Sequence, residues 1–265
     1  MRGFQFSRKT LGIPYAVFLF VFVAAPLAVL IFYAFTNGQG QPTLANLTGF
    51  FTSAYTLGTL VYSFAVAVIT TAVCLLIAYP TAYILAASKL KRKSLLLLLF
   101  LMPMWINFSL RLTALKEILS LLEENMALYP FLNTIIGMTY DFLPFMILPI
   151  YTTLSRMDIS LIEAARDLGA GEWEAFLKVT LPLSVPGIVS GVSMVFLPSM
   201  TNYVVLEMLY NSTYIMGSLI GSYFAAYDWH GGSMIALILL AVICLFTLVT
   251  GDSQREDNAR GGVLL

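Results

Sequence analysis

Residues 161–188 read LIEAARDLGAGEWEAFLKVTLPLSVPGI, a stretch that holds six of the chain's charged residues. Long apolar segments precede and follow it. An ionised side chain is costly inside the hydrocarbon core of a membrane. The stretch is therefore expected to lie outside the membrane, between two segments that cross it.

The composition of the whole chain predicts a helical membrane protein. Of its 265 residues, 59% are hydrophobic and 11% are charged, and the mean hydropathy is +0.87, whereas about a quarter of the residues of a soluble domain are charged. The apolar runs are continuous, while a transmembrane β-barrel would show alternation over segments of about ten residues. The net charge is zero, so nucleic-acid binding has no electrostatic support.

Six apolar segments are long enough to cross a bilayer, which takes about 20 residues of helix. They lie at about 13–35, 57–87, 95–115, 133–154, 186–208 and 232–250. We expect an all-α membrane protein with one transmembrane domain over residues 1–265. It would have a polar loop at about 155–185 and a disordered tail at 251–265, because that tail is polar and contains glycine.

The basic residues predict the orientation, since cytoplasmic loops are enriched in Lys and Arg. With the N-terminus inside, only Arg111 and Lys116 lie on the outer side. Twelve basic residues then lie in the cytoplasm: Arg2, Arg8, Lys9, Lys89, Lys91, Arg92, Lys93, Arg156, Arg166, Lys178, Arg255 and Arg260. Both termini are therefore expected to be cytoplasmic.

The loop at about 155–185 has the sequence signals of two short helices. Ser160 and Glu163 have the spacing of a capping box that starts the first helix, and Gly169 suits the left-handed position that ends it. A second helix is expected from Gly171 to Pro182, before the next span opens at residue 186. Its apolar stripe is Trp173, Phe176, Leu177 and Thr180.

Two interpretations of this pair of helices are open. They could lie on the lipid surface, but interfacial helices usually have a polar face rich in Lys and Arg. Acidic residues outnumber basic ones between residues 156 and 178, so an anionic leaflet would not attract this loop. The pattern favours docking of a protein partner.

The run EAARDLGAGEWEAFLKVTLPLSVPGI resembles the EAA loop of bacterial ABC importer permeases. The matching positions are Glu163, Ala164, Ala165, Gly169, Val179, Leu181 and Pro182. In that family the loop forms two coupling helices that insert into a cleft of the ATP-hydrolysing subunit. The resemblance thus implies an ATPase-coupling role for the following residues: Glu163, Ala164, Ala165, Asp167, Gly169, Trp173, Phe176, Leu181 and Pro182.

Segments 103–119, 143–170, 195–208 and 228–236 are similar to the spermidine/putrescine permeases. This resemblance implies a type I ABC importer permease with six spans, in the bacterial inner membrane. The partners it implies are a second permease (PotC-like), two ATP-binding subunits (PotA-like), a periplasmic or lipid-anchored substrate-binding protein (PotD-like) and membrane lipid. No cofactor is then expected on this chain, and ATP with Mg²⁺ would be used by the partner ATPase.

A path for a polyamine would need carboxylates, and aromatic faces for cation–π contact. The candidates are Trp105, Asn107, Tyr140, Asp141, Tyr203 and Glu207. Each has a structural alternative. Asp141 could form an ion pair with Arg111, Glu207 could be an interfacial residue in water, and aromatic residues near span ends are often interface anchors.

Other functions are open at this stage. Related permeases carry sulfate, iron, phosphate or thiamine, so the cargo could be another small solute. A self-contained secondary transporter or channel is a further alternative, and it would work without an ATPase. The sequence contains no phosphate-binding loop of the GxxxxGK[ST] type and no catalytic motif, so we expect a transport subunit and not an enzyme.

Overall fold

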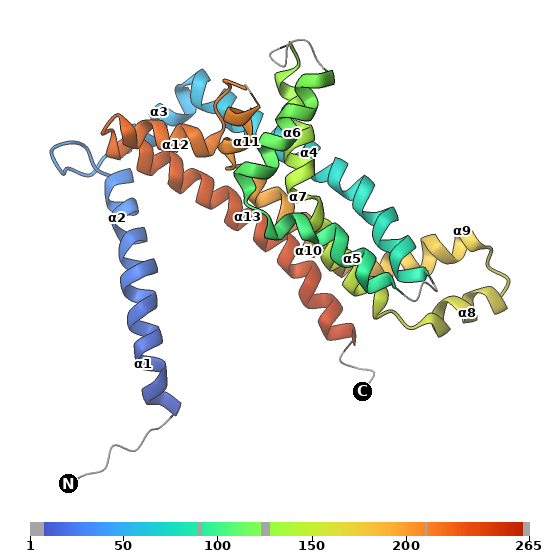
Figure 1. Ribbon diagram of the computed structural model, residues 1–265. Coiled ribbons are helices and arrows are strands. Elements are labelled where there is room, and N and C mark those ends of the chain that lie inside the picture. Colours follow the sequence, from blue (N-terminus) through green and yellow to red (C-terminus); the bar gives the residue numbers. More distant parts are fainter. Residues whose placement is uncertain (1–7, 89–91, 123–127, 210, 262–265) are drawn as a thin grey trace, which may run out of the picture. The chain divides into compact units, whose positions relative to one another are not determined.

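The computed structural model describes the backbone of residues 8–88, 92–122, 128–209 and 211–261, and the side chains between residues 12 and 251. In these ranges the chain is mostly helical and contains no strand (Figure 1). The chain divides into two compact units, which are described separately. Unit 1 comprises residues 1–59 and 218–242, and unit 2 comprises residues 60–217 and 243–265.

The elements follow one another as α1 (Arg8–Leu19), the π-helix η1 (Phe20–Ala24), α2 (Ala25–Ala34), α3 (Ala45–Thr52), α4 (Ala54–Ala87), α5 (Lys93–Leu101), the 3-10 helix η2 (Met102–Trp105), α6 (Phe108–Leu122), α7 (Pro130–Ser155), α8 (Ile159–Asp167), α9 (Glu172–Ala175), the π-helix η4 (Phe176–Thr180), α10 (Leu181–Ser199), α11 (Tyr203–Met208), α12 (Met216–Ala225) and α13 (Trp229–Gly261).

The helices that can cross a membrane coincide with the six predicted segments. Five continuous helical segments are long and apolar enough, and they are Gly12–Ala34, Ala54–Ala87, Pro130–Ser155, Glu172–Ser199 and Trp229–Gly251. A sixth candidate is a bent pair, Lys93–Trp105 with Phe108–Leu122, whose two parts meet at 100°. A multi-pass helical membrane protein is therefore confirmed. The sequence favours a kink after Pro103 within the segment 95–115, and the structure breaks the third span at that place, more sharply than a kink.

The break in the third span has a local cause. Pro103 lies in η2 and has no N–H to continue the helical hydrogen bonds. Ile106 then adopts an extended conformation, with φ −84° and ψ 142°. Asn107 starts α6, because its Oδ1 accepts hydrogen bonds from the N–H groups of Ser109 (3.0 Å) and Leu110 (3.4 Å). A proline followed four residues later by a helix-capping asparagine thus divides the span.

The predicted limits of the fifth span, 186–208, are wrong at both ends. The chain is helical without interruption from Glu172 to Ser199, through α9, η4 and α10. Pro182 does not end the preceding helix but lies in the first turn of α10. The carbonyl with which its ring would clash, four residues earlier, belongs to the wider turns of the π-helix. Beyond Ser199 the chain turns and forms the separate short helix α11.

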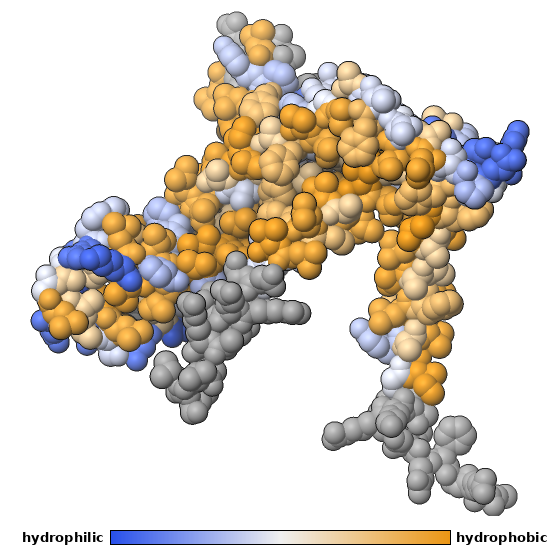
Figure 2. Space-filling view, turned by 180° about the vertical axis from the view of Figure 1, so that it is seen from behind, coloured by the Kyte–Doolittle hydropathy of each residue, from blue (hydrophilic) through white to orange (hydrophobic). Residues whose placement is uncertain are grey.

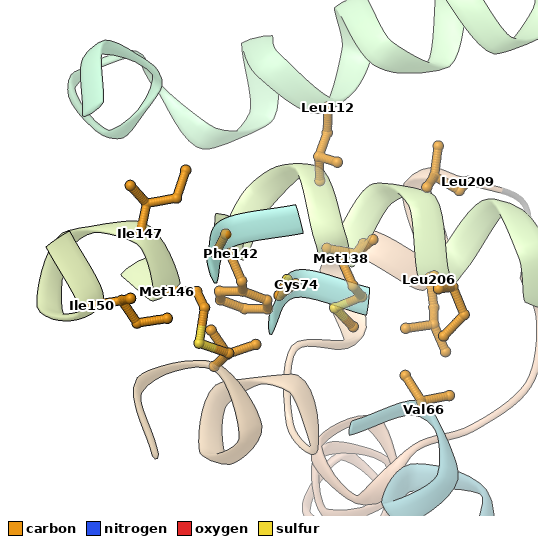
Figure 3. Packing of buried hydrophobic residues seen from close by; sticks show 14 of the residues in the cluster. Val66, Cys74, Leu112, Met138, Phe142, Met146, Ile147, Ile150, Leu206 and Leu209 are labelled. Carbon is orange, nitrogen blue, oxygen red and sulfur yellow. The ribbon is translucent and has the colours of Figure 1, made fainter. Parts of the chain in front are cut away.

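The core of unit 2 is built around α7. Its buried side chains include Met138, Phe142, Met146, Ile147 and Ile150, and they pack with residues from α4, α6 and α11 (Figure 3). Val66 and Cys74 of α4, Leu112 of α6, and Leu206 of α11 with Leu209 lie among them (Figure 3). Lipid tails are as apolar as these side chains, so inside a membrane the core is held by close van der Waals packing and not by removal from water. This core therefore fixes α7 as the central helix of the unit.

Helices α7 and α10 pack closely because two glycines of α10 face α7. A Cβ at Gly187 would lie 2.6 Å from Thr153 Oγ1, and a Cβ at Gly191 would lie 2.6 Å from Met146 Sδ. The spacing of four residues places both glycines on one face of α10. No side chain can be added at either position without moving α7.

Asn211 connects the chain after α11 to the rest of unit 2. Its Nδ2 donates hydrogen bonds to Tyr62 Oη (2.9 Å) and Thr134 Oγ1 (2.8 Å), and its Oδ1 accepts one from the Thr213 N–H (3.0 Å). Asn211 is only 4% exposed, so these bonds satisfy a buried amide. The segment after α11 is thereby held against α4 and α7.

Unit 1 contains the first span and the start of the last one. Among the described residues, no side chain of the most apolar part of Gly12–Ala34 is buried. His230 Nδ1 lies 3.0 Å from the Tyr33 carbonyl oxygen, and Asn46 Nδ2 donates to the Ala34 carbonyl at 2.9 Å. A cavity of about 250 Å³ lies between α3, the start of α4, α12 and the start of α13.

The predicted disordered tail is partly wrong. Helix α13 continues through Thr250 to Gly261, and residues 262–265 of the predicted tail lie outside the described residues. The segment 252–260 contains Gln, Arg, Glu and Ala, which are good helix formers. A helix that enters this segment already formed extends at little cost, because only its first turn is unfavourable to form.

Candidate functional site

The polar loop forms two short helices joined by a tight turn, and we call residues 156–180 the α8–α9 bracket. Helix α8 starts at Asp158, whose Oδ1 accepts a hydrogen bond from the Ser160 N–H (3.0 Å). The predicted capping box of Ser160 and Glu163 is therefore wrong by two residues. Asp is as good an N-cap as Ser, and this bond lowers the pKa of the exposed Asp158 carboxyl.

Gly169 ends α8 with φ +90°, which confirms the predicted left-handed position. The Gly169 N–H donates to the Arg166 carbonyl (2.9 Å), and the Ala170 N–H donates to the Ala165 carbonyl (3.0 Å). These two bonds define a Schellman motif. The turn between the two helices is therefore closed by backbone bonds and has one defined geometry.

Four of the eight charged side chains of the bracket form two ion pairs. Arg166 Nη2 lies 2.8 Å from Glu172 Oε2, which joins α8 to α9 across the turn. Lys178 Nζ lies 2.6 Å from Glu174 Oε1, one turn apart. Exposed pairs contribute at most about 1 kcal/mol each. The Arg166–Glu172 pair nevertheless adds a connection between α8 and α9 beside the backbone bonds of the turn.

Two large apolar side chains of the bracket are strongly exposed. Leu168 is 90% exposed and Trp173 is 70% exposed. A hollow of about 370 Å³ lies beside them, between Ala165 and Gly169 on one side and Ala175 and Val179 on the other. In Figure 2 hydrophobic side chains cover most of the visible face, and hydrophilic ones gather at the end of unit 2 where α8 and α9 lie. This arrangement suits docking of a protein partner.

Phe176 does not belong to the exposed stripe. It is half-buried, and its ring lies edge-on to Tyr83 (centroids 5.5 Å apart) and Tyr79 (6.0 Å) of α4. Trp173 stacks on Phe176 with centroids 5.4 Å apart. The prediction that Phe176 forms part of a free apolar stripe is therefore wrong. Tyr79 and Tyr83 were missed, although their spacing of four residues puts them on one face of α4.

The other predicted coupling residues lie within the bracket or directly after it. Glu163, Ala164 and Asp167 are exposed on α8, whereas Ala165 is half-buried beside the hollow. Leu181 is half-buried and Pro182 is exposed in the first turn of α10. Their role in coupling stays a prediction.

Asp141 forms the ion pair that the sequence left open as an alternative. Its Oδ1 lies 2.5 Å from Arg111 Nη2, and both side chains are 7% exposed. The pair joins α6 to α7 inside unit 2. Asp141 is therefore paired within the chain, and its carboxylate is not exposed. Its place on a substrate path stays a prediction.

The remaining path candidates are exposed. Trp105 is 75% exposed at the break in the third span, Tyr203 is 40% exposed at the start of α11, and Tyr140 is 38% exposed on α7. Glu207 is exposed on α11. The Oδ1 of Asn107 already caps α6, so this atom is not free to accept a bond from a substrate.

Similarity to known proteins shows the family of this chain. A family model described as "Binding-protein-dependent transport system inner membrane component" matches residues 78–251. The spermidine/putrescine transport system permease protein PotB of Haemophilus influenzae is 33% identical over 97% of this chain and 96% of its own length. PotB of Escherichia coli is 33% identical over 82% of this chain and 85% of its own length.

A solved structure shares the fold. The crystal structure of a bacterial alginate ABC transporter, in complex with an alginate pentasaccharide-bound periplasmic protein, contains a chain that superposes with a TM-score of 0.74. It covers 94% of this chain and 93% of that one at 12% identity. Together with the candidate spans, these matches describe a multi-pass inner-membrane protein. The chain belongs to the family of binding-protein-dependent transport system inner membrane components, the permeases of ABC importers.

Proposed function

We propose that this chain is a permease subunit that forms half of a translocation path for polyamines across the inner membrane. The observation that supports the transport role most directly is the α8–α9 bracket, an exposed docking element with a defined turn. The polyamine cargo is supported by the PotB relatives, whose names state spermidine/putrescine transport.

The proposed assembly has four further subunits. A PotC-like permease completes the path, two PotA-like subunits bind and hydrolyse ATP with Mg²⁺, and a PotD-like periplasmic or lipid-anchored protein delivers the substrate. This chain binds no cofactor in the proposal and surrounding lipid covers its exposed spans. It acts as a moving part of the transporter and not as an enzyme.

Coupling follows from the geometry of the bracket. The Schellman turn at Gly169 and the Arg166–Glu172 pair connect α8 and α9 at two points. The bracket can therefore transmit a rigid-body movement. Helix α9 continues into α10 without interruption, so a displacement of the bracket by an ATP-binding subunit reaches the fifth span directly.

The substrate side of the proposal rests on exposed groups in and beside the spans. Trp105, Tyr140 and Tyr203 present aromatic faces, which attract ammonium groups. Glu207 presents a carboxylate. Trp105 also lies at a break in a span, where non-helical backbone is tolerated only if protein covers it or water lines it. These residues are the proposed wall of the path.

A competition assay tests the cargo. The complete complex is reconstituted in proteoliposomes with the binding protein outside and ATP inside, and uptake of labelled spermidine is measured. Unlabelled putrescine and spermidine are expected to reduce the labelled uptake, whereas sulfate and thiamine are not. Competition by sulfate alone would contradict the polyamine assignment, and uptake without any ATP-binding subunit would contradict the transport mechanism.

A further inference from the structure

We infer that Phe176 is a positioning residue that transmits the movement of the α8–α9 bracket to α4, through ring contacts with Tyr79 and Tyr83. The inference rests on the proposed function, in which an ATP-binding subunit docks on the bracket. It adds a second route into the membrane part of the chain, beside the direct continuation of α9 into α10.

The contact joins elements far apart in the sequence. Phe176 begins η4, directly after the short helix α9, whereas Tyr79 and Tyr83 lie on one face of α4 near its end. The Phe176 ring meets Tyr83 at 80° with centroids 5.5 Å apart, and Tyr79 at 80° with centroids 6.0 Å apart. Edge-to-face geometry at these distances is attractive and directional. Displacing α9 therefore displaces α4 or breaks both contacts.

Phe176 is separated from the docking surface by Trp173. The two rings stack at 20° with centroids 5.4 Å apart, and Trp173 is 70% exposed while Phe176 is half-buried. A partner pressing on the bracket would thus contact Trp173 and act on Phe176 through it. The chain of ring contacts therefore runs from the exposed Trp173 to Phe176, and from Phe176 to the two tyrosines of α4.

A hydrogen bond reinforces the same junction. Tyr79 Oη lies 3.0 Å from Ser184 Oγ of α10, so Tyr79 contacts both the start of η4 and the first turns of the fifth span. Ser184 is fully buried. Helices α4 and α10 are thereby joined at Tyr79, which also contacts the Phe176 ring.

The π-helix η4 lies between α9 and α10 and begins with Phe176 itself. Single π-helical turns inside α-helices frequently occur at functional sites. Here the π-helical residues Phe176–Thr180 separate α9 from α10. The helix departs there from the regular α-helical hydrogen-bond pattern, and the ring contacts to α4 supply a second connection of this segment to the membrane part of the chain.

The test compares variants that keep or remove the rings. In the reconstituted complex, Phe176→Leu and Tyr83→Leu remove a ring on either side of the contact, while Phe176→Tyr and Tyr83→Phe keep it. ATP hydrolysis and spermidine uptake are measured on the same proteoliposomes. The two leucine variants are expected to hydrolyse ATP but to import about five-fold less spermidine per ATP, the low end of typical coupling between sites. The ring-retaining variants are expected to keep the wild-type ratio.

Co-purification separates the possible outcomes. Leucine variants that retain the ATP-binding subunits and import with the wild-type ratio would overturn the inference. Loss of those subunits from the Phe176→Leu complex, together with a Tyr83→Leu complex that assembles and imports with the wild-type ratio, would make Phe176 a docking residue and would also overturn the inference. Tyr83 lies on α4 outside the bracket, so Tyr83→Leu tests the contact even if Phe176→Leu does not assemble. A wild-type complex without ATP-dependent uptake would instead contradict the proposed function.

Discussion

Gly169 determines the geometry of the bracket at the scale of single residues. Its φ of +90° lies in the left-handed region, where a residue with a Cβ costs about 1–2 kcal/mol. No atom lies within 4 Å of a Cβ built there, so the cost comes from the backbone and not from a clash. A side chain added at a glycine with extended backbone and equally open surroundings should not carry this cost.

We therefore expect Gly169→Val to distort the turn and to lower the amount of substrate imported per ATP, while ATP hydrolysis persists. Gly171→Val is the matched control, because Gly171 has φ −68° and ψ 165° and makes no side-chain cap, and its surroundings are equally open. β-branched residues suit extended backbone. Equal coupling in the two variants, measured as uptake per ATP, would show that the turn at Gly169 is not needed.

Asp141 and Arg111 give a second prediction at the residue scale. Asp141→Asn removes the counter-charge of a guanidinium that is 7% exposed. The Nε and Nη1 of Arg111 have no hydrogen-bond partner among the described residues. Breaking a buried pair from one side costs about 3–5 kcal/mol. The purified variant is therefore expected to unfold at a clearly lower temperature than the wild type.

The double variant Arg111→Gln with Asp141→Asn separates stability from transport. It removes both charges, so most of the lost thermal stability should return. If Asp141 serves only as the partner of Arg111, the double variant imports spermidine at the wild-type rate. If Asp141 binds an ammonium group of the substrate, the stable double variant still fails to import spermidine. That result would assign Asp141 to the substrate path.

At the scale of elements, the two glycines of α10 determine how closely it packs on α7. A Cβ at Gly191 would lie 2.6 Å from Met146 Sδ and 3.2 Å from the Met146 carbonyl oxygen. Overpacking of this kind costs about 1–3 kcal/mol. We expect Gly191→Ala to lower the unfolding temperature of the purified protein. Gly58→Ala in α4 is the control, because its site is open and Ala is the better helix former; an equal decrease in both would contradict the packing argument.

The sequence predicted the existence of the helices better than the positions where they bend, break or begin. The orientation that the basic residues predict stays a prediction. From apolar length the sequence located the candidate spans, and its polarity and Gly169 indicated the bracket. It did not predict the 100° bend of the third span, because Pro103 is also compatible with a mild kink. Nor did it predict that α10 begins before Pro182, since the π-helical turns that accommodate this proline have no sequence signal of their own.

The candidate site was predictable as a segment but not as a set of contacts. Helical periodicity placed Phe176 with Trp173 on one stripe, and periodicity cannot show which members of a stripe face another helix. Tyr79 and Tyr83 lie about 95 residues earlier in the chain. Their contact with Phe176 exists only in the folded unit, so a single sequence does not reveal it.

At the scale of the whole molecule, the distribution of basic residues predicts which loops face the cytoplasm. The loop between α2 and α3 carries no charge between residues 36 and 56, whereas the bracket contains Arg166 and Lys178. With both termini inside, this uncharged loop lies outside and the bracket lies inside. Docking of an ATP-binding subunit requires that orientation, so a measured topology tests the transport proposal independently of any substrate.

Single cysteines at two exposed positions measure the topology. Cys244 is exposed and is first replaced by Ser, while Cys74 is fully buried and can stay. Gln39→Cys lies in the loop between α2 and α3, and Ser160→Cys lies on the first turn of α8. A membrane-impermeant maleimide is expected to label Gln39→Cys in intact spheroplasts, and Ser160→Cys only after permeabilisation. Labelling of Ser160→Cys in intact spheroplasts would place the bracket outside the cell, where no ATP-binding subunit could reach it.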